Sequence, residues 1–317
     1  MLKAAVKRAC WSSSCIDVEK LFTDNRVQKL LYSLTEVVPE KVFQQRQVRS
    51  LSRPVYQLMT ASQLEKLNRR AAKRALERLQ FPPVLQPYDE NAPLLQKEPD
   101  LSGHDTAKFV FVDITFGLSN EQRCVVVREP SGDLRGVPAN KRDRYIRLYY
   151  PKRNRHIIDP PAFSSAFLQE ALSQGKHIFV LNWACVQFEP GDPEFIRICT
   201  TVYNDVNARE LWNSLQSTRF YGPLIFYLVL NKDVDRILLS LMNEKKIEAA
   251  VKIVSLYNLV HYDSESTVWK PTHHNDSEKL KTLWQYAERD SKNRAAMESV
   301  LHSQGLCQRV EFRCWKK

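Results

Sequence analysis

Positively charged side chains recur at helical spacing shortly before residue 80. Arg69 and Lys73 accompany a row with four-residue spacing that consists of Lys66, Arg70, Arg74 and Arg78. Residues four apart lie on one side of an α-helix, and like charges at that spacing destabilise an isolated helix. Six cations within thirteen residues therefore indicate an anionic neighbour. We predict that this neighbour is RNA phosphate; a solvated charged face is the alternative.

A second basic cluster combines cations with aromatic rings. Its cations are Lys141, Arg142, Arg144, Arg147, Lys152, Arg153 and Arg155. Tyr145 and Tyr149 lie among them. Cations pair with phosphate while aromatic rings stack on exposed bases, so this combination also favours RNA. The alternative is a helix that packs its tyrosines into the core.

Catalytic and metal-binding patterns are scarce. Asp113 lies in an apolar run and could serve as a general base, although such a residue is more often a hydrogen-bonded member of a strand. Glu189 and Asp192 flank a turn and are expected to be solvated. The sequence contains no Walker A loop, G-x-G-x-x-G, H-E-x-x-H or G-x-S-x-G. The seven cysteines form no C-x-x-C pair, and the adjacent His273 and His274 cannot easily face one metal. We therefore predict no catalytic residue, metal, cofactor or small-molecule substrate.

The elements that carry the basic clusters have recognisable ends. Thr60 can cap a helix with Gln63 as its capping-box partner, and Phe81-Pro82-Pro83 ends that helix. The sequence predicts strands at 108–116, 123–128, 177–188 and 194–203. Further helices are predicted at 18–34, 138–150, 206–216, 218–230, 233–242, 244–261 and 276–303.

These elements predict an α+β fold with a β-containing middle domain, a helical C-terminal half and a basic N-terminal helical extension. The expected divisions are a presequence at 1–16, the extension at 17–85, a linker at 86–107, a mixed α/β middle domain at 108–205 and a helical region at 206–317. No apolar run reaches the roughly 18 residues of a membrane helix, so no membrane insertion is expected.

The net charge of +11 is unevenly distributed along the 317 residues. Residues 1–80 carry a net charge of +9 and residues 141–155 carry +6, whereas 81–140 and 156–291 each carry −4. Segregated charge of this kind is typical of surfaces that contact a polyanion.

The first 16 residues contain Lys3, Lys7 and Arg8 but no acid, and Leu2 and Val6 fall on one side of a helix. A basic, amphipathic, serine-bearing start is typical of a mitochondrial presequence. An ordinary basic N-terminal arm is the alternative.

Several segments resemble a known family in their order and spacing. They are Tyr56-Gln57-Leu58-Met59-Thr60, Pro82-Pro83-Val84-Leu85, Val126-Val127-Arg128-Glu129-Pro130-Ser131-Gly132 with Leu134-Arg135, Gln187-Phe188-Glu189-Pro190, and Ser217-Thr218-Arg219. Over about residues 54–261 the chain resembles the mitochondrion-specific family numbered twenty-two among small-subunit ribosomal proteins. The resemblance implies a non-catalytic, peripheral component of the mitochondrial ribosome that contacts rRNA and neighbouring proteins in the matrix. It supplies no catalytic or ligand-binding residue.

Three functions are therefore compared. The first is a structural protein of the mitochondrial small subunit, whose partners are the small-subunit rRNA and other small-subunit proteins. The second is a matrix RNA-binding or ribosome-assembly factor that is not stably part of the ribosome. The third is an enzyme that uses Asp113. A ribosomal protein should be equimolar with the small subunit, whereas a factor should be substoichiometric.

Overall fold

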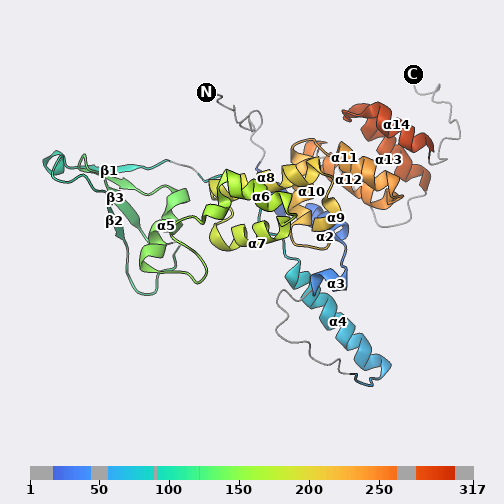
Figure 1. The fold of residues 1–317 in the computed structure, drawn as a ribbon, viewed down its shortest axis with the longest axis horizontal. Helices are drawn as coiled ribbons and strands as arrows, with labels where there is room; N and C mark the ends of the chain where they lie inside the picture. Colours follow the sequence, from blue (N-terminus) through green and yellow to red (C-terminus); the bar gives the residue numbers. More distant parts are fainter. Residues whose placement is uncertain (1–16, 44–55, 89–90, 121, 263–275, 304–317) are drawn as a thin grey trace.

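The computed structural model describes residues 17–43, 56–88, 91–120, 122–262 and 276–303. A small sheet lies at one end of an elongated molecule, a large helical body follows, and a single long helix projects from that body (Figure 1). The α+β prediction with a helical C-terminal half is confirmed. The predicted presequence at 1–16 and the pair His273 and His274 lie outside the described residues.

The sheet has four antiparallel strands in the order β1-β4-β3-β2. Their bounds are β1 Leu94–Lys97, β2 Phe109–Val112, β3 Val125–Arg128 and β4 Asp133–Gly136. The strands predicted at 108–116 and 123–128 are confirmed as β2 and β3. Strand β1 and the 3-10 turn η1 (Pro99–Leu101) fall in the segment that the sequence predicted as a linker. All four residues of β1 are exposed, so its sequence lacks the alternation that identifies a half-buried strand.

Helix α5 (Ala139–Tyr149) packs against β2 and β3 on one face of the sheet. Val125 and Val127 of β3 are buried on that face, while Phe109 and Phe111 of β2 stay about half exposed on the other. The β3–β4 turn requires Gly132, which has a φ of 84° and whose Cβ, if present, would lie 2.1 Å from the carbonyl oxygen of Glu98.

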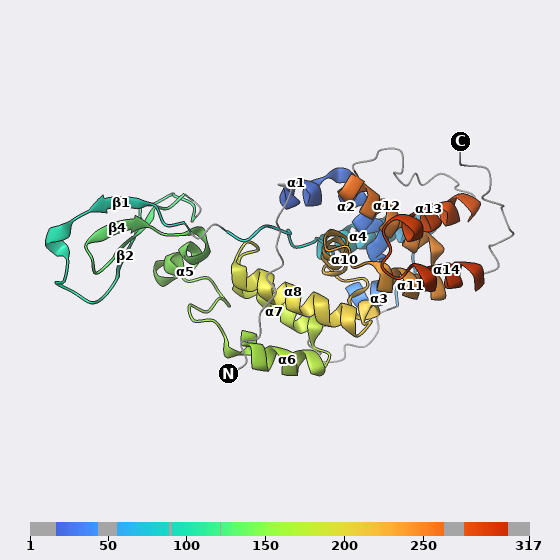
Figure 2. The same cartoon turned by 90° about the horizontal axis from the view of Figure 1, so that it is seen from above.

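The helical body is built from helices that precede the sheet in the sequence and helices that follow it. Its helices are α1 Val18–Thr23, α2 Asn25–Thr35, α3 Pro39–Val42, α6 Ser165–Ser173, α7 His177–Gln187, α8 Pro193–Ala208, α9 Trp212–Leu215, α10 Tyr221–Leu230, α11 Asp235–Asn243, α12 Ile247–Tyr262, α13 Asp276–Arg289 and α14 Arg294–Ser303, with the 3-10 turn η2 Pro161–Phe163. Helix α2 packs against α10 and α12 (Figure 2). The first part of the N-terminal extension, α1 and α2, therefore belongs to the main core.

The strands predicted at 177–188 and 194–203 are wrong, because both segments are helices, α7 and α8. Their apolar, β-branched composition favoured strands, but the buried side chains of α8 follow helical spacing, as Phe195, Ile198 and Val202 illustrate. The start of α8 also carries helix signals. Asp192 accepts a hydrogen bond from the backbone N–H of Glu194, and Pro193 occupies the first turn.

The helix predicted at 276–303 is divided into α13 and α14. At the break, the buried carboxylate of Asp235 on α11 accepts hydrogen bonds from the backbone N–H groups of Lys292 and Asn293, at 2.7 and 3.2 Å. The hydroxyl of Tyr286 donates to the same carboxylate at 2.8 Å. A side chain from a distant helix thus caps α14, which no local pattern reveals.

The chain between the projecting helix and the sheet lies along the helical body. Phe81 stacks on Tyr32 of α2, with ring centroids 4.4 Å apart. The Phe81 ring also lies so close to Gly222 that a Cβ there would approach it to 2.6 Å. The Phe81 contacts fix the base of the projecting helix against the core.

Candidate nucleic-acid interface

The projecting helix is α4 (Ala61–Arg78), which carries the first basic cluster (Figure 1). The predicted capping box is present: Gln63 N–H donates to Thr60 Oγ1, and Thr60 N–H donates to Gln63 Oε1 at 3.0 Å. Ala75 is the helix's one buried residue, and Leu79 is buried just beyond its end. At about 1.5 Å per residue, its 18 residues extend roughly 27 Å.

The cations of α4 are exposed, and most have no partner within the described chain. This group comprises Lys66, Arg70, Lys73 and Arg74. Arg69 pairs with Glu65 at 2.5 Å, but both side chains are more than 60% exposed. Arg78, at the base, donates to the carbonyl oxygen of Val42 and lies over the Phe43 ring. The described residues therefore leave the charge on α4 largely uncompensated.

Apolar side chains on α4 are also left uncovered by the described chain. Leu64 and Leu76 are each 52% exposed, and Leu67 is 41% exposed. Within the described residues, only the C-terminal end of this apolar surface, at Ala75 and Leu79, packs on the protein. An uncovered apolar stripe beside a basic face suits a helix that contacts both protein and a polyanion.

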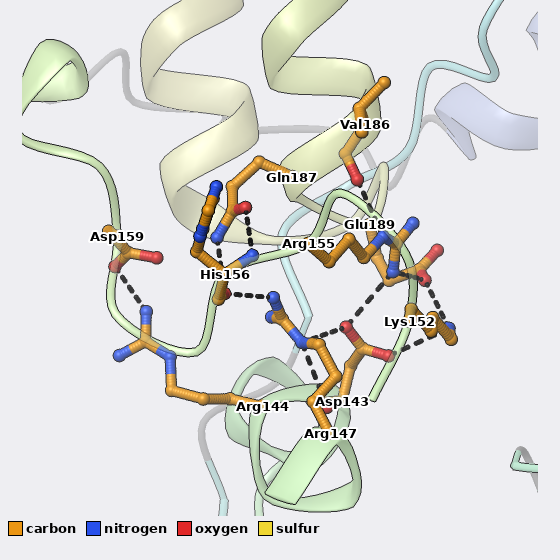
Figure 3. Close-up of polar contacts among 10 residues, drawn as sticks. All are labelled: Asp143, Arg144, Arg147, Lys152, Arg155, His156, Asp159, Val186, Gln187 and Glu189. Atoms are coloured by element: carbon orange, nitrogen blue, oxygen red, sulfur yellow. Dashed lines mark hydrogen bonds and ion pairs between the residues drawn. The ribbon is translucent and has the colours of Figure 1, made fainter. Parts of the chain in front are cut away.

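The second basic cluster has a different environment, because most of its cations contact the protein's own oxygen atoms. We call the group Asp143, Arg147, Lys152, Arg155 and Glu189 the polar hub (Figure 3). Asp143 pairs with Arg147 and Lys152 at 3.1 Å each and with Arg155 at 3.2 Å. Glu189 pairs with Lys152 at 3.4 Å and also with Arg155.

Hydrogen bonds from the polar hub join the sheet end to the helical body. Arg147, only 3% exposed, donates to the carbonyl oxygen of His156 at 2.7 Å. Arg155 donates to the carbonyl oxygen of Val186 on α7 at 2.7 Å. The fully buried side chain of Gln187 both accepts from and donates to the backbone of His156. These contacts bridge α5 and α7 (Figure 3).

The remaining cations of the second basic cluster fall into two groups, those that contact the protein and those that are exposed without a partner in the described chain. Arg144 pairs with Asp159, and Arg142 donates to the carbonyl oxygen of Arg123 at 2.5 Å. Lys141 and Arg153 are exposed and have no partner in the described part of the chain. The predicted site residues are thus not brought together as one surface. They form an exposed set on α4 and a largely compensated set around α5.

The acids that compensate this cluster were not recognised from the sequence. Glu189, expected to be solvated, instead forms two ion pairs in the polar hub. Asp143 lies four residues before Arg147, a spacing that favours ion pairing on a helix and was an available signal. Asp192 caps α8 rather than lying free, and burial raises the pKa of its carboxyl group.

Comparison with known proteins decides the family. Residues 20–262 match the family described as mitochondrial 28S ribosomal protein S22. The chain is 33% identical over 282 residues to the small ribosomal subunit protein mS22 of Bos taurus, covering 89% of this chain and 78% of that protein. It is 36% identical over 245 residues to the protein of the same name from Mus musculus, covering 77% and 68%. The chain belongs to the mitochondrial ribosomal protein S22 family. The resemblance predicted for about 54–261 is confirmed and extends to residue 20.

The segments that resemble the S22 family lie at structural junctions of the fold. Thr60 caps α4, and Gln187 and Glu189 hold the sheet end to the helical body. In the β3–β4 hairpin, Arg128 pairs with Glu98 at 2.7 Å and fixes the turn at Gly132. These segments therefore position the elements of the S22 fold relative to one another.

Asp113, the one acid considered for catalysis, follows β2 and closes a turn. Its carboxylate accepts hydrogen bonds from the backbone N–H of Thr115 at 2.9 Å and from the Thr115 hydroxyl at 2.6 Å. These hydrogen bonds lower the pKa of Asp113 below its ordinary value. A carboxylate with a lowered pKa is a weaker base, so the geometry favours a structural role.

Two further features bear on binding chemistry. Within the described residues, no group of three or more His, Cys, Asp or Glu side chains is arranged to hold a metal ion. Among the described residues of this chain, no helix combines the length and the apolar character needed to cross a bilayer.

Proposed function

We propose that this protein is a non-catalytic structural component of the small subunit of the mitochondrial ribosome. In the mitochondrial matrix it would support translation by binding small-subunit rRNA and neighbouring ribosomal proteins. Membership of a mitochondrial ribosomal protein family supports the assignment. The observation that carries the RNA contact is the projecting helix α4, whose cations have few partners among the residues that the structure describes.

The exposed cations and the exposed leucines of α4 would bind different partners. Lys66, Arg70 and Arg74 face solvent and would contact phosphates, releasing the counterions that surround RNA. Leu64, Leu67 and Leu76 would be covered by a neighbouring protein. The second cluster would contribute through its exposed members, Lys141 and Arg153, because the polar hub already engages Arg147, Lys152 and Arg155.

Sucrose-gradient sedimentation of mitochondrial lysates tests the proposal. The protein should co-sediment with the small subunit and be present in equimolar amount. A substoichiometric protein that leaves mature subunits would instead identify an assembly or RNA-binding factor and overturn the structural role.

The RNA contact is tested with Lys66→Gln/Arg70→Gln/Arg74→Gln, which removes three charges and keeps helix propensity. Arg78 is left intact because it also contacts Val42 and Phe43. The triple variant should be released from small subunits at lower salt than wild type. Retention at high salt equal to that of wild type would show that α4 is a solvated face. A charge-matched control changes three exposed cations of the helical body, Arg236, Lys281 and Lys292, to Gln.

A further inference from the structure

A cavity of about 880 Å³ opens where the base of α4 meets the helical body. Its walls come from α3, the C-terminal end of α4, α7, α9 and the loop before α10. Three cations from distant parts of the sequence line it: Lys41, Arg78 and Arg219. Neutral polar side chains from Asn182, Ser214, Ser217 and Thr218 complete its polar lining. No acidic residue of the described chain is among the lining residues.

The protein holds each of these cations through contacts that leave its charge in place. Lys41 Nζ donates to the carbonyl oxygen of Asn213 at 3.1 Å. Arg78 Nη1 donates to the carbonyl oxygen of Val42 at 3.0 Å. Arg219 Nη2 donates to Asn182 Oδ1 at 2.8 Å. Amide and carbonyl oxygens orient a cation without cancelling its net charge, so the cavity remains positively charged.

Arg219 has an unused hydrogen-bond donor. Its Nε is enclosed and has no acceptor among the described residues, while its guanidinium lies 4.9 Å from the centre of the Phe220 ring. Buried donors are nearly always paired, so an orphan here favours an acceptor from outside the described residues. Guanidinium groups suit phosphate oxygens because they present several N–H donors in one plane.

The cavity continues the basic row of α4. Each four-residue step advances about 6 Å along a helix and turns about 40° around it. The row Lys66, Arg70, Arg74 therefore winds gradually around α4 and ends at Arg78, which lines the cavity. A polyanion that follows the exposed cations of α4 would be led to this point.

We propose that the cavity binds the phosphate backbone of the RNA strand that lies along α4. Lys41, Arg78 and Arg219 are the ligands, and Asn182 orients the guanidinium of Arg219. The inference rests on the proposed function, since it requires the chain to bind RNA. It adds a site on the body of the protein that neither basic run contains in full, because Lys41 and Arg219 lie outside both.

The test uses the full chain and a fluorescein-labelled oligouridylate, with binding measured by fluorescence anisotropy over a series of salt concentrations. The cavity variant is Lys41→Gln/Arg219→Gln, and Arg236→Gln on α11 is a control, because this arginine is exposed and has no partner in the described chain. The slope of log affinity against log salt should fall by roughly 1.4 in the cavity variant, at about 0.7 per lost contact with a single strand. The control should keep the wild-type slope.

Folding effects are separated by two further measurements. Circular dichroism melting compares the stability of all variants. Arg219→Lys keeps the positive charge, so it should retain the wild-type slope even if the loss of the Asn182 contact lowers stability. Lys41 is exposed, and Lys41→Gln alone should remove about 0.7 from the slope without changing the melting temperature.

The triple variant Lys66→Gln/Arg70→Gln/Arg74→Gln, which we call the α4 variant, separates this inference from the proposed function. If the slope falls for the α4 variant but not for the cavity variant, the cavity inference is wrong and RNA binding by α4 stands. If the wild-type chain shows no salt-dependent RNA binding, the proposed RNA contact and the cavity inference both fail. A cavity variant that keeps its RNA slope but loses binding to polyglutamate would identify an acidic protein segment as the occupant and overturn the RNA assignment.

Discussion

Helix α4 and the segment from 141 to 155 are both dense runs of Lys and Arg, yet the surroundings of their charged groups differ. Lys66, Arg70 and Arg74 of α4 lie in solvent without acidic partners in the described chain. Arg147 and Arg155 are instead covered and paired with Asp143. One cluster is available to a polyanion, and the other holds two parts of the protein together.

The contrast depends on the position of a few acids. Asp143 lies within the second basic run, and Glu189 is brought to it by the fold, so three cations share two carboxylates in the polar hub. On α4, Glu65 reaches only Arg69. Cation density alone therefore does not identify a nucleic-acid surface. Charge that stays uncompensated after folding is the more informative feature.

The largest expected effect is that of Asp143→Asn. It leaves the buried Arg147 without its carboxylate and Arg155 with Glu189 as its one remaining acid in the polar hub. Removing one partner of a buried pair costs about 3 kcal/mol of unfolding free energy. Urea denaturation followed by circular dichroism measures the loss. The control, Glu77→Gln on exposed α4, should change stability by less than about 0.5 kcal/mol. Equal stability of the two variants would remove the distinction between the clusters.

A smaller effect is expected for Thr60→Ala at the start of α4. Because α4 buries little of its own surface, its end depends on the capping box, whose loss costs about 1 kcal/mol. The loss should be local. Hydrogen exchange should accelerate in the first turns of α4 and remain unchanged in α5, and uniform acceleration in both would indicate that α4 is coupled to the core more tightly than its exposure suggests.

Lys152→Gln tests whether the polar hub acts in folding rather than in RNA binding. Its side chain is 37% exposed and pairs with both Asp143 and Glu189, so we expect a loss of about 0.5–1 kcal/mol. RNA affinity measured on the folded protein should match that of wild type. A lower salt slope at unchanged stability would instead place Lys152 in the RNA interface.

The smallest effect, and one of opposite sign, is expected for Arg70→Gln. This change relieves repulsion with Lys66 and Arg74, and because all three side chains are exposed it should stabilise α4 by only about 0.2 kcal/mol for each pair. Thermal unfolding at low salt measures the gain, which should shrink as salt screens the charges. Destabilisation would show that Arg70 makes a contact that keeps α4 in place.

Local signals predicted the parts of the fold that are determined locally. The Thr60 capping box, the proline end of α4 and the strands β2 and β3 were all recognisable. Helix caps and the patterns of apolar residues in strands depend on residues close together in the sequence. Helices α7 and α8 were missed because β-branched and aromatic residues favour strands intrinsically, while packing in a helical core overrides that weak preference.

The sequence by itself determined the family, the α+β class, the helical C-terminal half and the existence of two basic clusters. Tertiary structure alone decided which cations remain available. Glu189 reaches Arg155 across 34 residues of sequence, and Asp235 caps α14 across 58 residues. The physical reason is that the free energy of a charge depends on its neighbours and its exposure in space. Both quantities are set only when distant segments pack together.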